Sequence, residues 1–215
     1  SADPVSGSKR RPSLAFSVVK NNPRIDIYTN VEGDKNNGNI RAAMDAPVFF
    51  SLLQLVKEAI AAEPGKRWAI QNKNYKWFGP GKKSDAPVNL SDTIIGKDAE
   101  GRIFISVIDK EDASRPKIKF CFGSGYWHDI FHGDGTPFTE VEDSVLCAKA
   151  FVGMLEGLIP VVMANEYEPP VPRDQQGGGQ GNSYGGNGGG NNNYQQKSGG
   201  GDINFDDDIF YCDDL

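Results

Sequence analysis

The sequence predicts an α+β fold in which antiparallel β-sheets pack against two helices. Two apolar segments with helical spacing, 47–60 and 145–159, each follow a pair of short runs rich in β-branched and aromatic residues. These four runs are typical of strands and cover residues 14–20, 24–30, 102–109 and 116–122. Strands followed by one helix, twice over, indicate helices packed on one face of antiparallel sheets.

Turn and cap residues support the boundaries in the first half. Asn21-Asn22-Pro23 predicts a turn between the first two strands, and a further strand is possible at 39–44. Asp45 can cap the helix that follows, and Pro47 suits its first turn. Pro64-Gly65 then ends that helix.

In the second half, Thr139 and Glu142 have the spacing of a capping box before the apolar run 145–159. The two halves also resemble each other. Residues 16–19 match 105–108, and residues 24–27 match 117–120, although chance similarity between amphipathic strands is the alternative. A duplicated strand-strand-helix unit resembles the whirly and PC4-like single-strand binders. An OB-fold β-barrel with added helices is the alternative fold.

The charge is divided unevenly along the 215 residues. Residues 1–172 hold 21 basic and 22 acidic side chains, whereas residues 173–215 hold 2 and 7, so the acidity of the chain lies in its tail. Three widely spaced cysteines indicate a reducing compartment. Because no apolar run approaches the length of a membrane span, we expect no membrane association and a cytoplasmic location.

The densest functional signal is a basic-aromatic cluster between residues 66 and 83, which contains no acidic residue. Its members predict a surface for unpaired nucleic acid, with cations that contact phosphates and rings on which bases stack. The predicted binding residues are Lys66, Arg67, Trp68, Lys73, Tyr75, Lys76, Trp77, Phe78, Lys82 and Lys83. The alternative is a solvated hairpin in which Trp68 and Phe78 are core residues. Residues 79–84 lack the Walker A spacing and predict the turn of a hairpin instead.

Tyr126 and Trp127 follow a flexible Gly-Ser-Gly turn, and we predict that they extend the stacking surface; alternatively they pack under the second helix. Several strand residues with polar character are candidates for the same groove, namely Arg24, Tyr28, Arg41, Lys117 and Lys119. His128 and His132 have a metal-ligand spacing, but glycines and a proline follow at once and no third ligand is near. We therefore expect no metal site, no cofactor and no enzymatic activity.

The tail combines a Gly/Asn/Gln-rich linker with an acidic-aromatic tip. A linker of this composition is expected to be disordered. The run 204–210, Asn-Phe-Asp-Asp-Asp-Ile-Phe, resembles the C-terminal peptide of bacterial single-stranded DNA-binding proteins, Asp-Phe-Asp-Asp-Asp-Ile-Pro-Phe. The proline is missing here, and five residues follow Phe210. The resemblance covers about the last forty residues and implies docking on replication and repair proteins through Phe205, Asp206, Asp207, Asp208, Ile209 and Phe210.

Together these features predict four segments: a flexible basic arm (1–12), a single-stranded nucleic-acid-binding domain (13–172), the disordered linker (173–201) and the partner-binding tip (202–215). We expect a phage-encoded protein of the host bacterial cytoplasm that binds single-stranded DNA without marked sequence preference. Its tip would recruit replication and recombination proteins, and the acidic tail would compete with DNA for the basic surface. The alternatives are an RNA-binding protein with a low-complexity tail, or a protein-protein adaptor.

Overall fold

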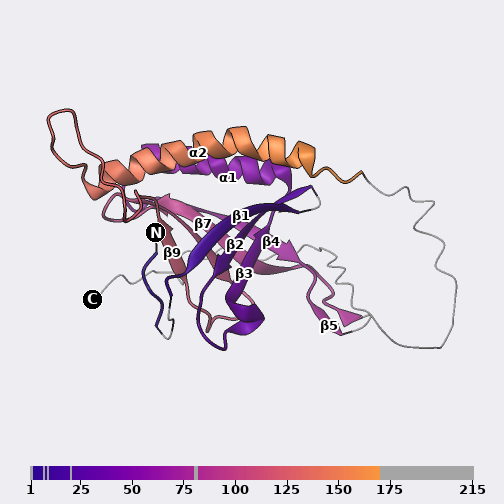
Figure 1. Cartoon of the computed structure of the whole chain (residues 1–215). Coiled ribbons are helices and arrows are strands. Elements are labelled where there is room, and N and C mark those ends of the chain that lie inside the picture. The colour runs from indigo at the N-terminus through magenta and orange to yellow at the C-terminus, as the bar shows by residue number, and fades with distance from the viewer. Residues whose placement is uncertain (1, 7, 9, 20, 80–81, 170–215) are drawn as a thin grey trace.

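A computed structural model describes residues 2–6, 8, 10–19, 21–79 and 82–169 (Figure 1). The predicted linker (173–201) and tip (202–215) lie outside the described residues. Within the part that is described, the elements follow one another as strands, one helix, more strands and a second helix. This is the predicted α+β class, with antiparallel sheets and two helices, and the prediction is confirmed.

The first sheet has three antiparallel strands, β1 (Ser13–Val19), β2 (Asn22–Tyr28) and β3 (Asn39–Ala43), in the order β1-β2-β3. Phe16 pairs with Ile25, which pairs with Ala42, so one face of this sheet is apolar. The short 3-10 turn η1 (Lys35–Gly38) connects β2 to β3. Asn36 and Asn37 in this turn adopt a left-handed backbone with φ of 54°, which asparagine tolerates better than most residues.

The second sheet has four antiparallel strands in the order β4-β7-β8-β9, which are β4 (Arg67–Asn74), β7 (Val88–Lys97), β8 (Ile103–Asp109) and β9 (Ile118–Cys121). Strands β5 (Trp77–Gly79) and β6 (Lys82–Lys83) form a separate two-stranded hairpin beyond the end of β4. The described strands thus form three sheets and not one closed barrel, so the architecture differs from the OB-fold alternative.

Two helices complete the fold, α1 (Ala46–Ala61) and α2 (Glu140–Asn165). Asp45 occupies the predicted N-cap position of α1, but its side chain makes no capping hydrogen bond to a described residue. The capping box before α2 is confirmed, because the Thr139 hydroxyl accepts from the Glu142 N–H and the Glu142 carboxylate accepts from the Thr139 N–H. The helix runs past Pro160, whereas the sequence predicted an end at 159; the hydrogen bond from the Glu166 N–H to the Val162 carbonyl continues it.

The main core lies where the two helices meet both sheets (Figure 1). Phe49, Leu52 and Leu53 of α1 are fully buried against Ile25 and Ile105, one from each sheet. Because strand side chains alternate, Ile94, Phe104 and Ile108 form a second, smaller cluster on the opposite face of the second sheet. The N-terminal segment joins the main core through Ala2, which is buried, and Val5.

The strand-strand-helix arrangement occurs twice, with hairpins β1–β2 and β8–β9 at the positions that the sequence comparison matched. Their registers differ. Phe16 pairs with Ile25, but its matched residue Ile105 pairs with Phe120, which lies two positions beyond the residue matched to Ile25. Duplication of the unit stays a prediction.

Candidate nucleic-acid interface

Strand β4 divides the basic-aromatic cluster into two groups. Lys66 and Arg67 lie where β4 begins, beside the end of the helix layer, whereas Lys73 lies near its other end. Eight strand residues span about 26 Å, so the cluster is not one continuous patch. At the first end, the half-buried Trp68 packs against the main core. For Trp68 the structure therefore matches the alternative given from the sequence, a core residue.

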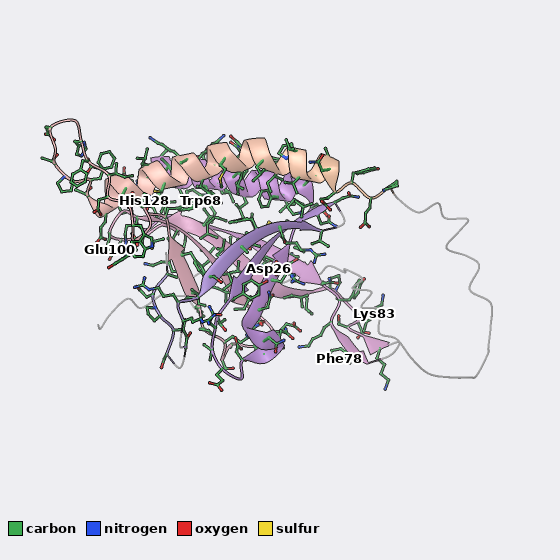
Figure 2. The ribbon with its side chains drawn as sticks, viewed as in Figure 1. Asp26, Trp68, Phe78, Lys83, Glu100 and His128 are labelled. Carbon is green, nitrogen blue, oxygen red and sulfur yellow. The ribbon has the colours of Figure 1, made fainter. Side chains whose placement is uncertain are left out.

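The second group occupies the β5–β6 hairpin, which projects from the body of the protein (Figures 1 and 2). Trp77 pairs with Lys83 and Gly79 with Lys82, as the predicted hairpin requires. Two hydrogen bonds close its base: the Ser84 N–H donates to the Lys76 carbonyl at 2.8 Å, and the Lys76 N–H donates to the Ser84 hydroxyl oxygen at 3.1 Å. The side chain of Trp77 is outside the described part of the structure.

Among the described side chains of the hairpin, the aromatic ring of Phe78 is exposed and lies near lysines. Phe78 is 65% exposed, so it is not a core residue. Lys73, Lys82 and Lys83 are exposed, and the Lys83 ammonium lies 4.2 Å from the centre of the Tyr75 ring, a cation–π contact. Lys76 differs from the others because its ammonium forms an ion pair with Glu111 at 3.3 Å. An exposed apolar ring flanked by cations is the combination that binds stacked bases and phosphates.

A polar groove of about 510 Å³ opens between the two sheets, next to the base of the hairpin. Its walls come from η1 and β3 on one side and from β4, β7, the end of β8 and the residues after it on the other. The lining residues are Asn36, Asn37, Asn39, Ile40, Arg41, Asn72, Leu90, Ser91, Asp109, Glu111 and Arg115. The sequence reasoning named Arg41 but missed the four asparagines, whose only local signal was the Asn36-Asn37-Gly38 turn pattern.

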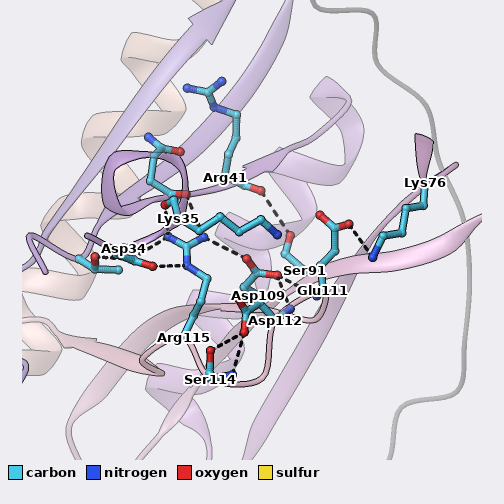
Figure 3. A network of polar contacts seen from close by, with 12 residues as sticks. Asp34, Lys35, Arg41, Lys76, Ser91, Asp109, Glu111, Asp112, Ser114 and Arg115 are labelled. Atoms are coloured by element: carbon cyan, nitrogen blue, oxygen red, sulfur yellow. Dashed lines mark hydrogen bonds and ion pairs between the residues drawn. The ribbon is translucent and has the colours of Figure 1, made fainter. Parts of the chain in front are cut away.

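Arg115 holds the two walls of this groove together (Figure 3). Its guanidinium donates to both carboxylate oxygens of Asp34 at 2.9 Å and to Asp109 at 3.0 Å. It also donates to the backbone carbonyls of Lys35 and Asn39. The Arg115 side chain is only 3% exposed and the two carboxylates 8% and 9%. The hydrogen bonds from Arg115 lower the pKa of Asp34 below its ordinary value, although burial opposes this change.

The outer face of the first sheet adds cations beside the groove. Arg24, Tyr28 and Arg41 share this face, because Arg41 pairs with Asp26 and side chains alternate along β2. The Arg41 guanidinium donates to the buried Asp26 carboxylate at 2.6 Å. Partial burial, together with the nearby positive charge of Arg41, lowers the pKa of Arg24. Lys117 and Lys119, predicted for the same groove, lie instead on the far edge of the second sheet, where Lys119 bonds Asp98 at 3.1 Å.

Tyr126 and Trp127 lie at the other end of the molecule from the hairpin, in the loop between β9 and α2. Figure 2 labels His128 in this loop and Phe78 and Lys83 at the opposite side. The two rings contact edge to face, with 4.8 Å between their centres. They are 90% and 84% exposed, so the alternative that they pack under the second helix is wrong. The structure therefore does not bring them together with the hairpin.

The histidines of this loop have ordinary partners. The His132 imidazole lies 3.5 Å from the Glu142 carboxylate and stacks on Phe138, and the backbone N–H of His128 donates to the Gly125 carbonyl. Across the residues that the structure describes, no group of three or more His, Cys, Asp or Glu side chains is placed to hold a metal ion.

No protein-family model, no curated protein and no solved structure matches this chain.

Proposed function

We propose that this protein binds single-stranded DNA without marked sequence preference during DNA replication or recombination. The observation that carries the proposal is the projecting hairpin with exposed Phe78 among Lys73, Lys82 and Lys83. Stacking of a base on an aromatic ring contributes roughly 1–3 kcal/mol and tolerates any base. Lysines that track phosphates add affinity that depends on salt and not on sequence.

The groove supports the same proposal through its charge balance. Two guanidiniums, Arg41 and Arg115, and two carboxylates, Asp109 and Glu111, line it, so its formal charge is zero. A neutral, amide-rich groove favours an uncharged polar group such as a nucleobase over a phosphate. Bases splayed from a strand that crosses the hairpin would enter the groove and meet Asn36, Asn37 and Asn72, while the phosphates stay near the lysines.

The acidic tail provides the recruiting part of the proposal. The tip resembles a known docking peptide, and its negative charge contrasts with a nearly neutral domain. We infer that the tip recruits replication or recombination proteins and, in their absence, competes with DNA for the cationic surface. Removing residues 202–215 should tighten binding to single-stranded DNA most clearly at low salt, where charge repulsion is least screened. Equal affinities of the two chains at low salt would contradict this competition.

The test of the main proposal is fluorescence anisotropy of labelled oligo(dT) titrated with the full chain at two salt concentrations. We expect binding that weakens with salt and exceeds binding to a duplex of the same length. The double variant Lys82→Gln/Lys83→Gln should bind more weakly and with a shallower salt dependence. Lys66→Gln, an exposed lysine at the opposite end of β4, is the control and should bind like the unaltered chain.

Two other outcomes would favour the alternative functions. Tighter binding to oligo(U) than to oligo(dU) of the same length would identify an RNA-binding protein, because the 2′-hydroxyl is the group that distinguishes them. No binding of either nucleic acid at low salt would leave the hairpin as a surface for an acidic protein.

A further inference from the structure

Helix α2 has an uncharged stripe along its outer side, which faces neither α1 nor the sheets (Figure 1). The buried face of the helix comprises Ser144, Ala148, Val152, Leu155 and Ile159. On the opposite side, at helical spacing, the stripe comprises Leu146, Ala150, Gly153, Met154, Gly157, Leu158, Val161 and Ala164. Its large members are well exposed: Met154 by 57%, Val161 by 55%, Leu158 by 47% and Leu146 by 41%.

Such a surface is unusual on a monomeric soluble protein, where large contiguous apolar patches mark interaction sites. The most apolar stretch of α2 is strongly hydrophobic, yet only 22% of it is buried. By length and composition alone the helix meets the criterion for a membrane span, which the sequence reasoning did not anticipate. Between residues 150 and 165 the only charged side chain is Glu156, and it pairs with Lys57 of α1 at 2.7 Å. The stripe itself carries no charge.

Two glycines in the middle of the stripe have no role within the described fold. A Cβ atom at Gly153 or Gly157 would meet no atom of a described residue within 4 Å, and neither residue has a positive φ. Glycine in a helix interior lowers helix stability relative to alanine. Among the described residues, neither packing nor backbone conformation requires these glycines, and small residues allow the close approach of another helix.

We propose that α2 pairs with α2 of a second copy of this chain, antiparallel, about a two-fold axis near Gly157. An isologous pair needs a self-complementary surface, and this stripe provides one. With the axis at Gly157, Gly153 faces the partner's Val161 and Ala150 faces the partner's Ala164. A bulky side chain thus meets a glycine, and the two backbones approach closely at the axis.

Charge favours the antiparallel arrangement. A parallel pair would place the acidic first turns, with Glu140, Glu142 and Asp143, side by side and would set Lys149 against the partner's Lys149. The antiparallel pair separates the acidic turns and brings Lys149 near the partner's Glu166. Lys149 is the only basic residue in α2, whereas helices that lie on bilayers are rich in Lys and Arg on their polar face. A second copy therefore fits the stripe better than a lipid surface.

The pairing is independent of the proposed function, because no residue of the stripe belongs to the hairpin or the groove. It also has a consequence for that function. Two copies joined through their helix layers keep both hairpins accessible, so one long strand can engage both, which increases the apparent affinity by raising the effective concentration of the second site.

The test is sedimentation equilibrium of the full chain over a range of concentrations. We expect a species of twice the 23.4 kDa chain mass. The double variant Met154→Lys/Leu158→Lys should raise the dimer dissociation constant by at least about tenfold, because it buries like charges at the centre of the pair. Its affinity for a short oligo(dT) that occupies one copy should be unchanged. Val19→Lys, which adds a charge at a 39% exposed valine on β1, is the control and should stay dimeric.

A second variant separates pairing from folding. Gly153→Gln/Gly157→Gln replaces two exposed glycines with better helix formers, so helix content by circular dichroism should stay equal or rise while the dimer weakens. A monomeric unaltered chain at every concentration, or a dimer that both double variants leave intact, would overturn the proposal. Flotation of the chain with phosphatidylcholine–phosphatidylglycerol vesicles, abolished by M154K/L158K, would assign the stripe to a bilayer instead. An unaltered chain that forms the dimer but does not bind oligo(dT) would refute only the proposed function.

Discussion

The body of the protein and its β5–β6 hairpin use the same kinds of side chain in opposite ways. In the body, Arg115 is 3% exposed and donates to two carboxylates, and Trp68 packs against the main core. In the hairpin, Phe78 is 65% exposed and Lys82 and Lys83 face solvent. A buried cation must find its anions within the fold, because an unpaired buried charge is strongly destabilising. An exposed cation has no such requirement and remains available to an external polyanion.

This comparison separates stability from binding. Cations and rings of the body should matter for the free energy of unfolding, whereas those of the hairpin should matter for the affinity for single-stranded DNA. Variants that affect both properties equally would remove the distinction.

The largest effect is expected for Arg115→Met. Removing the guanidinium leaves Asp34 and Asp109 buried without their partner, which should lower the free energy of unfolding by about 3–5 kcal/mol. Urea denaturation measures this change. The control is Lys57→Met, which breaks an ion pair whose side chains are 46% and 35% exposed and should cost less than about 1 kcal/mol. Equal losses for the two variants would contradict the assigned role of Arg115.

Trp68→Ala should also act on stability. The half-buried ring packs on the main core, so its removal should lower the free energy of unfolding by about 3 kcal/mol. The affinity of the folded fraction for oligo(dT) should stay the same, because Trp68 lies at the other end of β4 from the hairpin. A loss of oligo(dT) affinity under conditions where the variant is fully folded would show that Trp68 belongs to the DNA interface.

Phe78→Ala should show the reverse pattern. Loss of one stacked base should weaken oligo(dT) binding by about 1–3 kcal/mol, while the free energy of unfolding changes by less than about 0.5 kcal/mol. Anisotropy titration and urea denaturation measure the two quantities. Phe131→Ala serves as the control, since Phe131 is 56% exposed but lies in the loop at the far end of the molecule.

A smaller effect distinguishes the two ends of β4 by charge alone. Lys83→Gln should reduce the slope of log affinity against log salt by about 0.7, the value for one phosphate contact on a single strand. Lys66→Gln changes a lysine that is also exposed, at the opposite end of β4, and should leave the slope unaltered. If the two variants gave the same slope of log affinity against log salt, DNA would contact both ends of β4 equally.

The smallest effect is expected for the pH dependence of the stability of the body in acid. The pKa of Asp34 lies below its ordinary value of 3.8, chiefly because Arg115 donates hydrogen bonds to it. A carboxylate with a depressed pKa stabilises the fold fully above 3.8, and this contribution is lost as the pH falls through its value in the folded state. Asp34→Asn should therefore make urea stability less dependent on pH below about 4. Asp85→Asn, at an exposed position, should follow the unaltered chain.

Much of the fold was predictable because patterns of neighbouring residues indicate its strands and helices. The pairs of strands before each helix alternate or cluster their apolar residues, and the Thr139–Glu142 box marked the start of α2. Strand β7 was not predicted, although it is central in the second sheet. Its residues Ser91 to Gly96 are buried on both faces and include Ser91, Asp92 and Thr93, so neither alternation nor a continuous apolar run reveals it.

The candidate site was predictable only in part. The hairpin is local, so a run of lysines and rings around a Gly-Pro-Gly turn was enough to indicate it. The groove is not local. Asn36, Asn72 and Glu111 come together only because η1, β4 and the residues after β8 line the same groove, and no spacing in the chain encodes that neighbourhood.

By itself, the sequence determined the α+β class, the hairpin and the division of charge between domain and tail, because each depends on residues close together in the chain. Tertiary structure decided which members of the basic-aromatic cluster face solvent. It packed the half-buried Trp68 on the main core, exposed Phe78 and separated Lys66 from Lys83 by the length of a strand. It also left the outer side of α2 exposed, since the burial of a helix face depends on what packs against it and not on its own composition.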